Sequence, residues 1–316
     1  MIVMVIQAAN LVHAVECGAA VFLAGCTLWY FRRALYFIGL TALGRNRYAT
    51  VGQVLKLPFH LPGYKRWAFA QAERMRVVQE DPAGYTQWDT CIGRFWVPAG
   101  SQFLKEVVAE TLYRHYGIGK QAVAAGDVVV DGGANVGVFV WDALQRGAAT
   151  VYAFEPSGEN LECLRRNFPE EIAAGRVVLV PKGLWDRTTV VRFAVSAENQ
   201  STNKIVDEPS AISARASVVE IPVTSIDAFK ADMGLARIDY IKLDVEGAER
   251  HVLDGAGETL KRDKPRLAVC VYHLVDDIDV LPEKVRRANP AYRIESGLCM
   301  ADGSPFRLRP HILFFL

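Results

Sequence analysis

The chain has 316 residues, of which 36 are basic and 35 acidic, so its formal net charge at pH 7 is +1. This balance produces no overall field that would hold a polyanion, and we therefore expect no nucleic-acid partner. The six cysteines are scattered without a CxxC spacing or nearby histidine pairs. That pattern predicts neither a zinc site nor a disulfide framework, and it favours a reducing cytoplasm.

The length allows one large α/β domain with an extension of roughly 100 residues. We expect an apolar helical segment at 1–47. An aromatic-rich region at 48–120 follows, and then the main domain at 121–316.

The first segment resembles a membrane anchor. Up to residue 31 it has one formal charge, Glu16, and the aromatic run 29–31 comes directly before Arg32 and Arg33. Interfacial aromatics followed by basic residues are typical of a helix whose C-terminal flank lies in the cytoplasm. We therefore predict a cytoplasmic protein that contacts the inner face of a membrane through residues 1–44.

The same segment also has an interpretation without a membrane. Its uninterrupted apolar part, 17–31, is only fifteen residues long, whereas a span needs roughly 20. Four polar residues interrupt the remainder at three-residue intervals, and on a helix they would drift about half way round it. These residues are Gln7, Asn10, His13 and Glu16.

The region 48–120 is mixed and rich in aromatic residues. Between Ser101 and Tyr116, apolar side chains recur with a period near 3.6, which predicts a helix. We expect this helix to pack on the sheet that follows, with the aromatic side chains in the core. These aromatics are Trp67, Trp88, Phe95 and Trp96.

From Gly126 to the C-terminus, short β-rich runs alternate with helical stretches. The runs are VVVD, TVYAFEP, RVVLVPKGL, VEIPVTSID, IDYIKLD, LAVCVYH and HILFFL. Such alternation predicts a Rossmann-like, doubly wound, mostly parallel seven-stranded sheet with helices on both faces. Because ligands of these sheets bind beyond the carboxyl ends of the strands, we expect the first two strand ends to form the site.

Each of these two strands ends in a carboxylate. Asp131 closes the first, and Gly132, Gly133 and Gly137 follow it. Glycines there allow conformations and close approaches that a Cβ would block, and the last one lets the next helix pack tightly. Glu155 ends the second strand, where an acid can accept hydrogen bonds from the 2′- and 3′-hydroxyls of a ribose.

The glycine loop departs from a dinucleotide fingerprint. In D-G-G-A-N-V-G, Ala134 takes the place of the middle glycine of G-x-G-x-x-G. The carboxylate of Asp131 would repel a pyrophosphate, yet it could receive the ammonium group of an amino-acid-bearing nucleoside. The loop therefore favours S-adenosylmethionine over NAD.

Five motifs follow one another with a defined spacing: GDVVVDGGANVGVF, GAATVYAFEPSGENLECLRRNF, GRVVLVPKGLWD, IPVTSIDAF and RIDYIKLDVEGAERHVLDGA. Together they resemble the FkbM family of S-adenosylmethionine-dependent methyltransferases over roughly residues 90–316. The resemblance implies the class I methyltransferase fold. Two positions depart from many relatives: Gly132, where Val or Cys is common, and Val271, where some carry Glu two places before His273.

The resemblance also implies roles for individual residues. The glycine loop would line the methionine side of the cofactor, Glu155 would hold the ribose, and residues from Gly183 to Asp186 would pass near the adenine. For Asn135 and Asp186, a helix N-cap and a turn acid remain open as alternatives. The loop residues concerned are Asp131, Gly132, Gly133, Asn135 and Gly137.

Methyl transfer to a hydroxyl is an in-line displacement in which the acceptor must lose its proton. The candidate bases are Asp244, Glu246 and His273, and His273 is expected to end the strand LAVCVYH. Glu246 and Glu249 should share one face of the first turn of a helix, with Glu249 in a structural role. Asp244 with Glu246 could instead hold a divalent metal, although no further ligands are evident.

The family resemblance implies O-methylation of a hydroxyl on a sugar, a glycolipid or a natural product. The residues alone leave two alternatives open. One is an NAD(P)-dependent oxidoreductase, and the other is a non-catalytic, membrane-tethered nucleoside-binding module.

Overall fold

The computed structural model describes residues 73–101, 103–113, 115–196, 204–205, 216–297, 299–301 and 308–316, together with 25, 32, 35, 38–39, 66–67 and 70–71. The chain divides into two compact units, one of residues 1–63 and 299–309 and the other of 64–298 and 310–316. The predicted anchor at 1–44 lies outside the described residues, apart from the isolated positions just given. None of the helices in the described part of the chain is long and apolar enough to cross a membrane.

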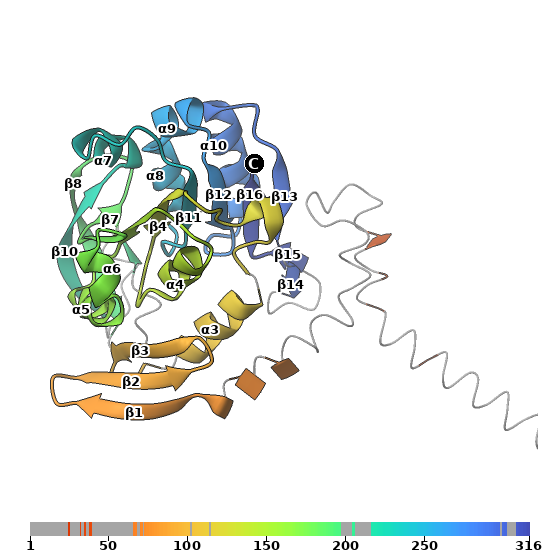
Figure 1. Cartoon of the computed structure of the whole chain (residues 1–316). Coiled ribbons are helices and arrows are strands. Elements are labelled where there is room, and N and C mark those ends of the chain that lie inside the picture. The colour runs from red at the N-terminus through yellow and green to blue at the C-terminus, as the bar shows by residue number, and fades with distance from the viewer. Residues whose placement is uncertain are drawn as a thin grey trace, which may run out of the picture. The chain divides into compact units, whose positions relative to one another are not determined.

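A seven-stranded sheet forms the centre of the second unit, in the order β13-β16-β12-β11-β4-β5-β6 (Figure 1). The strands from β12 to β6 are parallel, and β16 runs antiparallel to both β12 and β13. The predicted doubly wound, mostly parallel sheet is therefore confirmed. The strands are β4 (Val128–Gly132), β5 (Thr150–Phe154), β6 (Val177–Val180), β11 (Tyr240–Leu243), β12 (Arg266–Cys270), β13 (Ile294–Ser296) and β16 (Ile312–Phe315).

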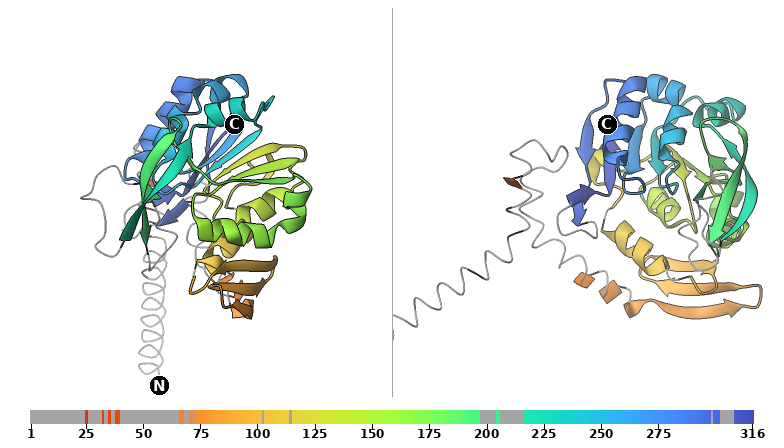
Figure 2. Two further views of the ribbon diagram at one scale, coloured as in Figure 1. Left: turned by 90° about the vertical axis from the view of Figure 1, so that its left-hand side faces the viewer. Right: turned by 180° about the vertical axis from the view of Figure 1, so that it is seen from behind.

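Helices cover both faces of this sheet (Figure 2). One face carries α4 (Val138–Gln145), α5 (Gly158–Asn167) and α6 (Pro169–Ala173). The other carries α7 (Ile226–Asp232), α8 (Glu249–Asp254), α9 (Gly257–Arg262) and α10 (Asp277–Ala288). Because both faces are covered, the central strands are buried almost throughout, as runs such as YIKL and RLAVC show.

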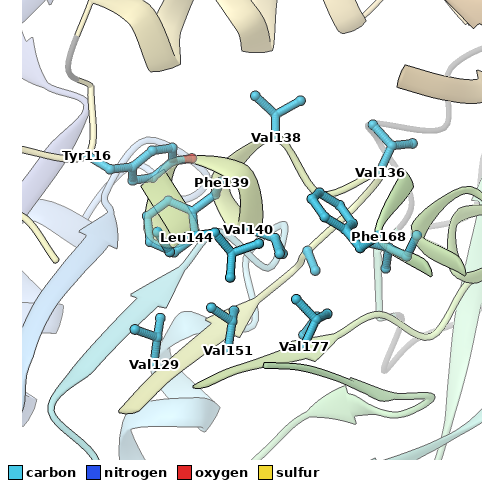
Figure 3. Close-up of a cluster of buried hydrophobic side chains, with 14 of the residues drawn as sticks. Tyr116, Val129, Val136, Val138, Phe139, Val140, Leu144, Val151, Phe168 and Val177 are labelled. Carbon is cyan, nitrogen blue, oxygen red and sulfur yellow. The ribbon is translucent and has the colours of Figure 1, made fainter. Parts of the chain in front are cut away.

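A cluster of apolar side chains fixes α4 on the sheet (Figure 3). Val129, Val151 and Val177 come from three neighbouring strands, and Phe139 and Val140 meet them from the helix. Each such side chain contributes about 1.5–3 kcal/mol when it is fully buried. This packing holds the start of α4, and with it the glycine loop, against the carboxyl end of β4.

A three-stranded antiparallel sheet precedes the central one along the chain. It consists of β1 (Arg76–Asp81), β2 (Tyr85–Thr90) and β3 (Gly93–Pro98), in that order. The sequence did not predict it. The helix predicted for residues 101–116 is present as α3 (Leu104–Leu112) and ends four residues before Tyr116.

Asn167, the last residue of α5, fastens β3 to the main domain. Its Oδ1 accepts a hydrogen bond from the Trp96 N–H at 2.7 Å, and its Nδ2 donates to the carbonyl oxygens of Trp96 at 3.1 Å and Val136 at 2.9 Å. One amide side chain thus joins β3, α5 and the loop before α4.

One predicted strand was assigned to the wrong sheet. VEIPVTSID lies mainly in β10 (Ala216–Thr224), which pairs antiparallel with β8 (Thr189–Ser196) in a second sheet of order β7-β10-β8-β9. Val218 and Val219 are 39% and 44% exposed there. An antiparallel sheet with one solvent-exposed face tolerates such exposed valines, whereas a central strand of a parallel sheet is buried on both faces.

The seventh strand of the central sheet is instead β13, which was not predicted. The run RVVLVPKGL also divides, with β6 in the central sheet and β7 (Gly183–Leu184) in the second. β9 (Lys204–Ile205) completes the second sheet, and β14 (Cys299–Ala301) pairs with β15 (Leu308–Pro310) in a two-stranded sheet.

Candidate active site

The loop between β4 and α4 depends on two of its glycines. Gly133 has a φ of +76°, and a Cβ there would lie 2.0 Å from the carbonyl oxygen of Asp244. Gly137 has a φ of +93°, and its Cβ would lie 2.3 Å from the ring of Phe168. Both positions therefore require glycine for packing as well as for backbone conformation. This confirms the predicted close approaches.

Asn135 has a left-handed backbone with φ +50°. Its N–H donates to Glu155 Oε2 at 2.8 Å, and its Oδ1 accepts from the N–H of Val136. The N-cap of α4 is Gly137. The N-cap alternative for Asn135 is therefore wrong, and the residue instead links the ends of β4 and β5.

Glu155 follows β5 and is 6% exposed. Its two carboxylate oxygens each accept one backbone N–H, from Asn135 at 2.8 Å and from Ser157 at 2.9 Å. Burial raises the pKa of Glu155, and hydrogen bonds from the backbone of Ser157 and Asn135 and from the side chain of Asn160 partly offset that rise. Since the two carboxylate oxygens have four lone pairs in all, the carboxylate can still accept a hydrogen bond from a ligand.

Asp131 is fully buried against Lys242, its neighbour on β11. The Lys242 Nζ lies 3.0 Å from Asp131 Oδ1 and donates to the carbonyl oxygens of Gly133 at 2.7 Å and Gly132 at 3.2 Å. Burial alone would lower the pKa of Lys242, but the charges of Asp131 and Asp244 outweigh it and raise that pKa. Lys242 is therefore a buried cation.

This pairing corrects the role predicted for Asp131. Its carboxylate does not line the cavity described below, because Lys242 already neutralises it inside the sheet. The lysine was not predicted. A signal for it was present in YIKLD, since a charged residue within a run expected to be buried requires a counterion.

Asp244 directly follows β11 and meets two tyrosines. Tyr116 OH donates to its Oδ2 at 2.9 Å, and Tyr272 OH donates to its Oδ1 at 3.3 Å. Burial alone would raise the pKa of Asp244, but the charges of Lys242 and His273 and the Tyr116 hydrogen bond hold it below its ordinary value. Asp244 is therefore an ionised acceptor.

His273 lies beside three carboxylates. Its Nδ1 is 2.8 Å from Glu249 Oε1, and its Nε2 is 3.5 Å from both Asp244 Oδ1 and Glu246 Oε2. Burial alone would lower its pKa, but the hydrogen bond to Glu249 and the surrounding negative charges raise it to about 9. The strand β12 ends at Cys270, so the prediction that His273 ends this strand is wrong.

Glu249 is fully buried as the first residue of α8, and its Oε1 also accepts the Val245 N–H at 2.9 Å. These contacts fit the structural role predicted for it. Glu246 is not on the helix, contrary to prediction. It lies in the preceding turn with φ +54°.

Glu246 is the most exposed carboxylate around His273. Its side chain is 35% exposed, against 24% for that of Asp244. Burial and the charges of Asp244 and Glu249, opposed by the charge of His273, together raise its pKa to about 7. Glu246 therefore changes its protonation state near neutral pH.

Several of these residues line a cavity with about 970 Å³ of empty space, including its opening to solvent. Of the predicted site residues, the cavity is lined by Gly133, Asn135, Glu155, Gly183, Asp244 and Glu246. Tyr116, Asn160 and Lys242 also line it and were not predicted.

The other predicted residues lie behind the cavity wall or away from it: Asp131, Gly132, Gly137, Asp186 and His273. Asp186 lies near Arg187 at 3.3 Å and near His251 at 3.6 Å, which agrees better with a turn acid than with a ligand contact.

Comparison with known proteins gives the following matches. The Methyltransferase FkbM domain matches residues 131–288. The 31-O-demethyl-FK506 methyltransferase FkbM of Streptomyces tacrolimicus is 31% identical over 204 residues, which are 57% of this chain and 76% of that protein.

Among solved structures, the methyltransferase FkbM from Methylobacillus flagellatus KT has a TM-score of 0.47 and 18% identity. The match covers 84% of this chain and 62% of that one, less than two thirds of its length. A putative methyltransferase from Streptococcus mutans in complex with SAH has a TM-score of 0.36 and 13% identity, over 65% of this chain and 95% of that one.

Proposed function

The chain belongs to the FkbM methyltransferase family, and from this premise we propose that it is an S-adenosylmethionine-dependent O-methyltransferase. We propose a hydroxyl of a sugar, a glycolipid or a natural product as the acceptor. The name of the Streptomyces relative specifies an O-demethylated compound, which supports transfer to oxygen. Family membership also favours this function over the nicotinamide-dependent oxidoreductase that the residues alone left open.

Several features of the cavity fit an adenosyl cofactor. Gly133 has no side chain to block the approach of a ligand to its backbone, Glu155 can still accept a hydrogen bond from a ribose hydroxyl, and the buried Oδ1 of Asn160 has no hydrogen-bond partner within the described residues. We propose that Glu155 and Asn160 hold the ribose side, and that the backbone from Gly133 to Asn135 holds the methionine side. When bound, S-adenosylmethionine supplies an electrophilic methyl group on a sulfonium centre.

One observation carries the choice of a hydroxyl acceptor: Glu246 lines the cavity with a pKa of about 7. A hydroxyl must give up its proton as it attacks, and a base works best when its pKa is near the working pH. We therefore assign the removal of this proton to the Glu246 carboxylate.

The neighbours of Glu246 suit supporting roles. His273 has a pKa of about 9, so at neutral pH it is protonated and orients Glu246 and Asp244 instead of accepting a proton. Asp244 already accepts two tyrosine hydroxyls, and its pKa is held low, so it is the weaker base.

A paired substitution tests this assignment on the full-length protein. Purified protein is incubated with methyl-labelled S-adenosylmethionine and a panel of sugars, glycolipids and natural-product hydroxyls. In parallel, calorimetry measures the affinity for S-adenosylhomocysteine. We expect Glu246→Gln to lower the transfer rate by about 10²–10⁴-fold and to leave this affinity unchanged. The wild-type rate should rise with pH through about 7.

Glu155→Gln is the matched control, a carboxylate at the other end of the cavity. We expect it to weaken S-adenosylhomocysteine binding about tenfold, as the loss of one buried hydrogen bond to a ligand does, with a smaller effect on the rate at saturation. A wild-type protein that binds the nucleoside but methylates nothing in the panel would favour the non-catalytic binding module. An unchanged rate in Glu246→Gln would exclude Glu246 as the base.

A further inference from the structure

The segment between β12 and α10 exposes three large apolar side chains, and we call it the apolar loop. Tyr272, Leu274 and Val275 are 39%, 40% and 68% exposed. The imidazole of His273, between them in the sequence, is turned inward and is only 8% exposed. Buried polar and exposed apolar side chains are the reverse of the usual distribution. Single exposed apolar side chains are ordinary on a protein surface, whereas a group of them commonly marks a binding site.

Hydrogen bonds beneath the apolar loop hold it in this conformation. The Nδ1 of His273 lies 2.8 Å from Glu249 Oε1, and the N–H of Leu274 donates to Asp277 Oδ2 at 2.8 Å. Asp277 is fully buried, and its other carboxylate oxygen accepts a hydrogen bond from Arg250 Nε at 2.7 Å. Because these partners anchor the loop from below, the fold itself keeps the apolar side chains in the solvent.

The apolar loop adjoins the end of the cavity that holds Glu246. The Tyr272 hydroxyl donates to Asp244 Oδ1 at 3.3 Å. A Cβ on Gly247, the residue after Glu246, would lie 3.9 Å from Leu274 Cδ2, so the leucine side chain lies beside this glycine. An acceptor whose hydroxyl reaches Glu246 would therefore have the apolar loop next to the rest of its structure.

The cavity also has apolar side chains in its wall. Val245 and Ala248, which lie within two residues of Glu246 in the sequence, line it. Phe103 and Val107, one helical turn apart at the start of α3, line it as well. Apolar surface is thus available to an acceptor both inside the cavity and on the loop outside it.

We propose that the apolar loop binds the acceptor, and that the acceptor joins its reactive hydroxyl to an apolar group such as an acyl chain or a hydrocarbon ring. This inference rests on the proposed function, and it selects a glycolipid or an apolar natural product over a free sugar. Leu274 and Val275 cannot form side-chain hydrogen bonds with the hydroxyls of a free sugar, and burying such hydroxyls unpaired is costly. An apolar group would instead remove exposed apolar surface from water, which is favourable.

The size of the apolar loop also fits an acceptor better than a second copy of the chain. A stable contact between two proteins takes about 800 Å² of surface from each partner. The loop offers three side chains, which suits one alkyl chain or ring of a small molecule.

The test uses the full-length protein saturated with S-adenosylhomocysteine. Methyl and n-octyl glucoside share one headgroup and differ in their alkyl chain, and ligand-observed NMR measures their affinities below the micelle concentration of the octyl compound. We expect octyl glucoside to bind at least about tenfold more tightly, as the burial of two further methylenes gives. Leu274→Ser and Val275→Ser should each lower the affinity for octyl glucoside about threefold or more and leave that for methyl glucoside unchanged. Leu274→Met should bind as the wild type does, because methionine is also apolar.

Val190→Ser is the matched control. Val190 is a valine on β8 that is 57% exposed and does not line the cavity, so its substitution should leave both affinities unchanged. Circular dichroism verifies that each variant is folded, and sedimentation measures its oligomeric state. The proposal is overturned if the two glucosides bind equally, if neither binds, or if folded Leu274→Ser and Val275→Ser keep the preference for the octyl compound. A changed oligomeric state with unchanged glucoside binding would overturn it as well and would identify a contact between copies.

Methyl transfer separates this inference from the proposed function. With any acceptor that the panel identifies, Leu274→Ser should raise KM about threefold or more and leave kcat unchanged, whereas Glu246→Gln lowers kcat. A preference for octyl glucoside without any methyl transfer would support the apolar loop and contradict the proposed function. Methyl transfer without this preference would support the proposed function and overturn the role of the apolar loop.

Discussion

The carboxylates past β4 and β5 and those past β11 are held in different ways. Asp131 is neutralised by Lys242, and Glu155 accepts two backbone N–H groups, so both are locked by partners that do not titrate near pH 7. Glu246 and His273 have pKa values of about 7 and about 9. The cavity is thus lined at one end by Glu155, which is held by fixed partners, and at the other by Glu246, which has a pKa of about 7. We proposed recognition of the cofactor for the first end, the recognition end, and proton transfer for the second, the proton-moving end.

The largest expected loss of stability comes from removing Lys242, the counterion of Asp131. Lys242→Met leaves the fully buried Asp131 without its counterion, which should cost about 3–5 kcal/mol of unfolding free energy in urea denaturation. The matched control is Lys284→Met, which breaks a surface pair with Asp254 and should cost less than about 1 kcal/mol. Equal losses in the two variants would show that the Asp131–Lys242 pair is not a buried charge pair.

We expect the stability of the fold to depend on pH through His273. Because the folded pKa of His273, about 9, exceeds its ordinary value of 6.5, the protonated histidine stabilises the fold fully below pH 6.5. This contribution, about 3 kcal/mol, is lost as the pH rises from 6.5 through about 9. Urea denaturation of the wild type and of His273→Gln between about pH 6 and pH 10 checks this. Identical pH profiles would contradict the assigned charge state.

A smaller loss of stability is expected at the contact between Gly133 and Asp244, which joins the two ends of the cavity. Gly133→Ala places a Cβ 2.0 Å from the Asp244 carbonyl oxygen, whereas Gly234→Ala, at a φ of +61°, meets nothing within 4 Å. Both variants carry the backbone strain of a positive φ, so their difference isolates the clash. We expect Gly133→Ala to lose roughly 1–3 kcal/mol more than Gly234→Ala in thermal unfolding. A difference near zero would mean that the loop moves away from Asp244 without cost.

Much of the recognition end could be predicted from the sequence, because strand ends and glycines are local signals. Asp131, Glu155 and Asp244 all lie at or just past the carboxyl end of a strand, as their motifs indicated. The role of Asp131 was wrong because a single residue does not reveal its neighbour on the next strand. Lys242 supplies that neighbour through the parallel register of β4 and β11.

The proton-moving end could be predicted only in part. Glu246 was a candidate, but its raised pKa depends on residues that β11, α8 and the segment after β12 bring together. Tyr116 was expected within a helix, and it reaches Asp244 only because α3 ends at Leu112. These contacts arise from tertiary packing, which hydrophobic periodicity does not encode.

The amide of Asn167 has a consequence for how this protein can be divided. The family match begins at residue 131. Asn167, however, forms hydrogen bonds with Trp96 as well as with Val136. The Phe168 ring also packs edge-on against Phe95. A fragment that begins just before residue 131 would lack β3. The Asn167 amide and the Phe168 ring would then lose their partners on β3, close to the glycine loop. We therefore expect the smallest fragment that folds and keeps the cavity to include the small antiparallel sheet at residues 76–98.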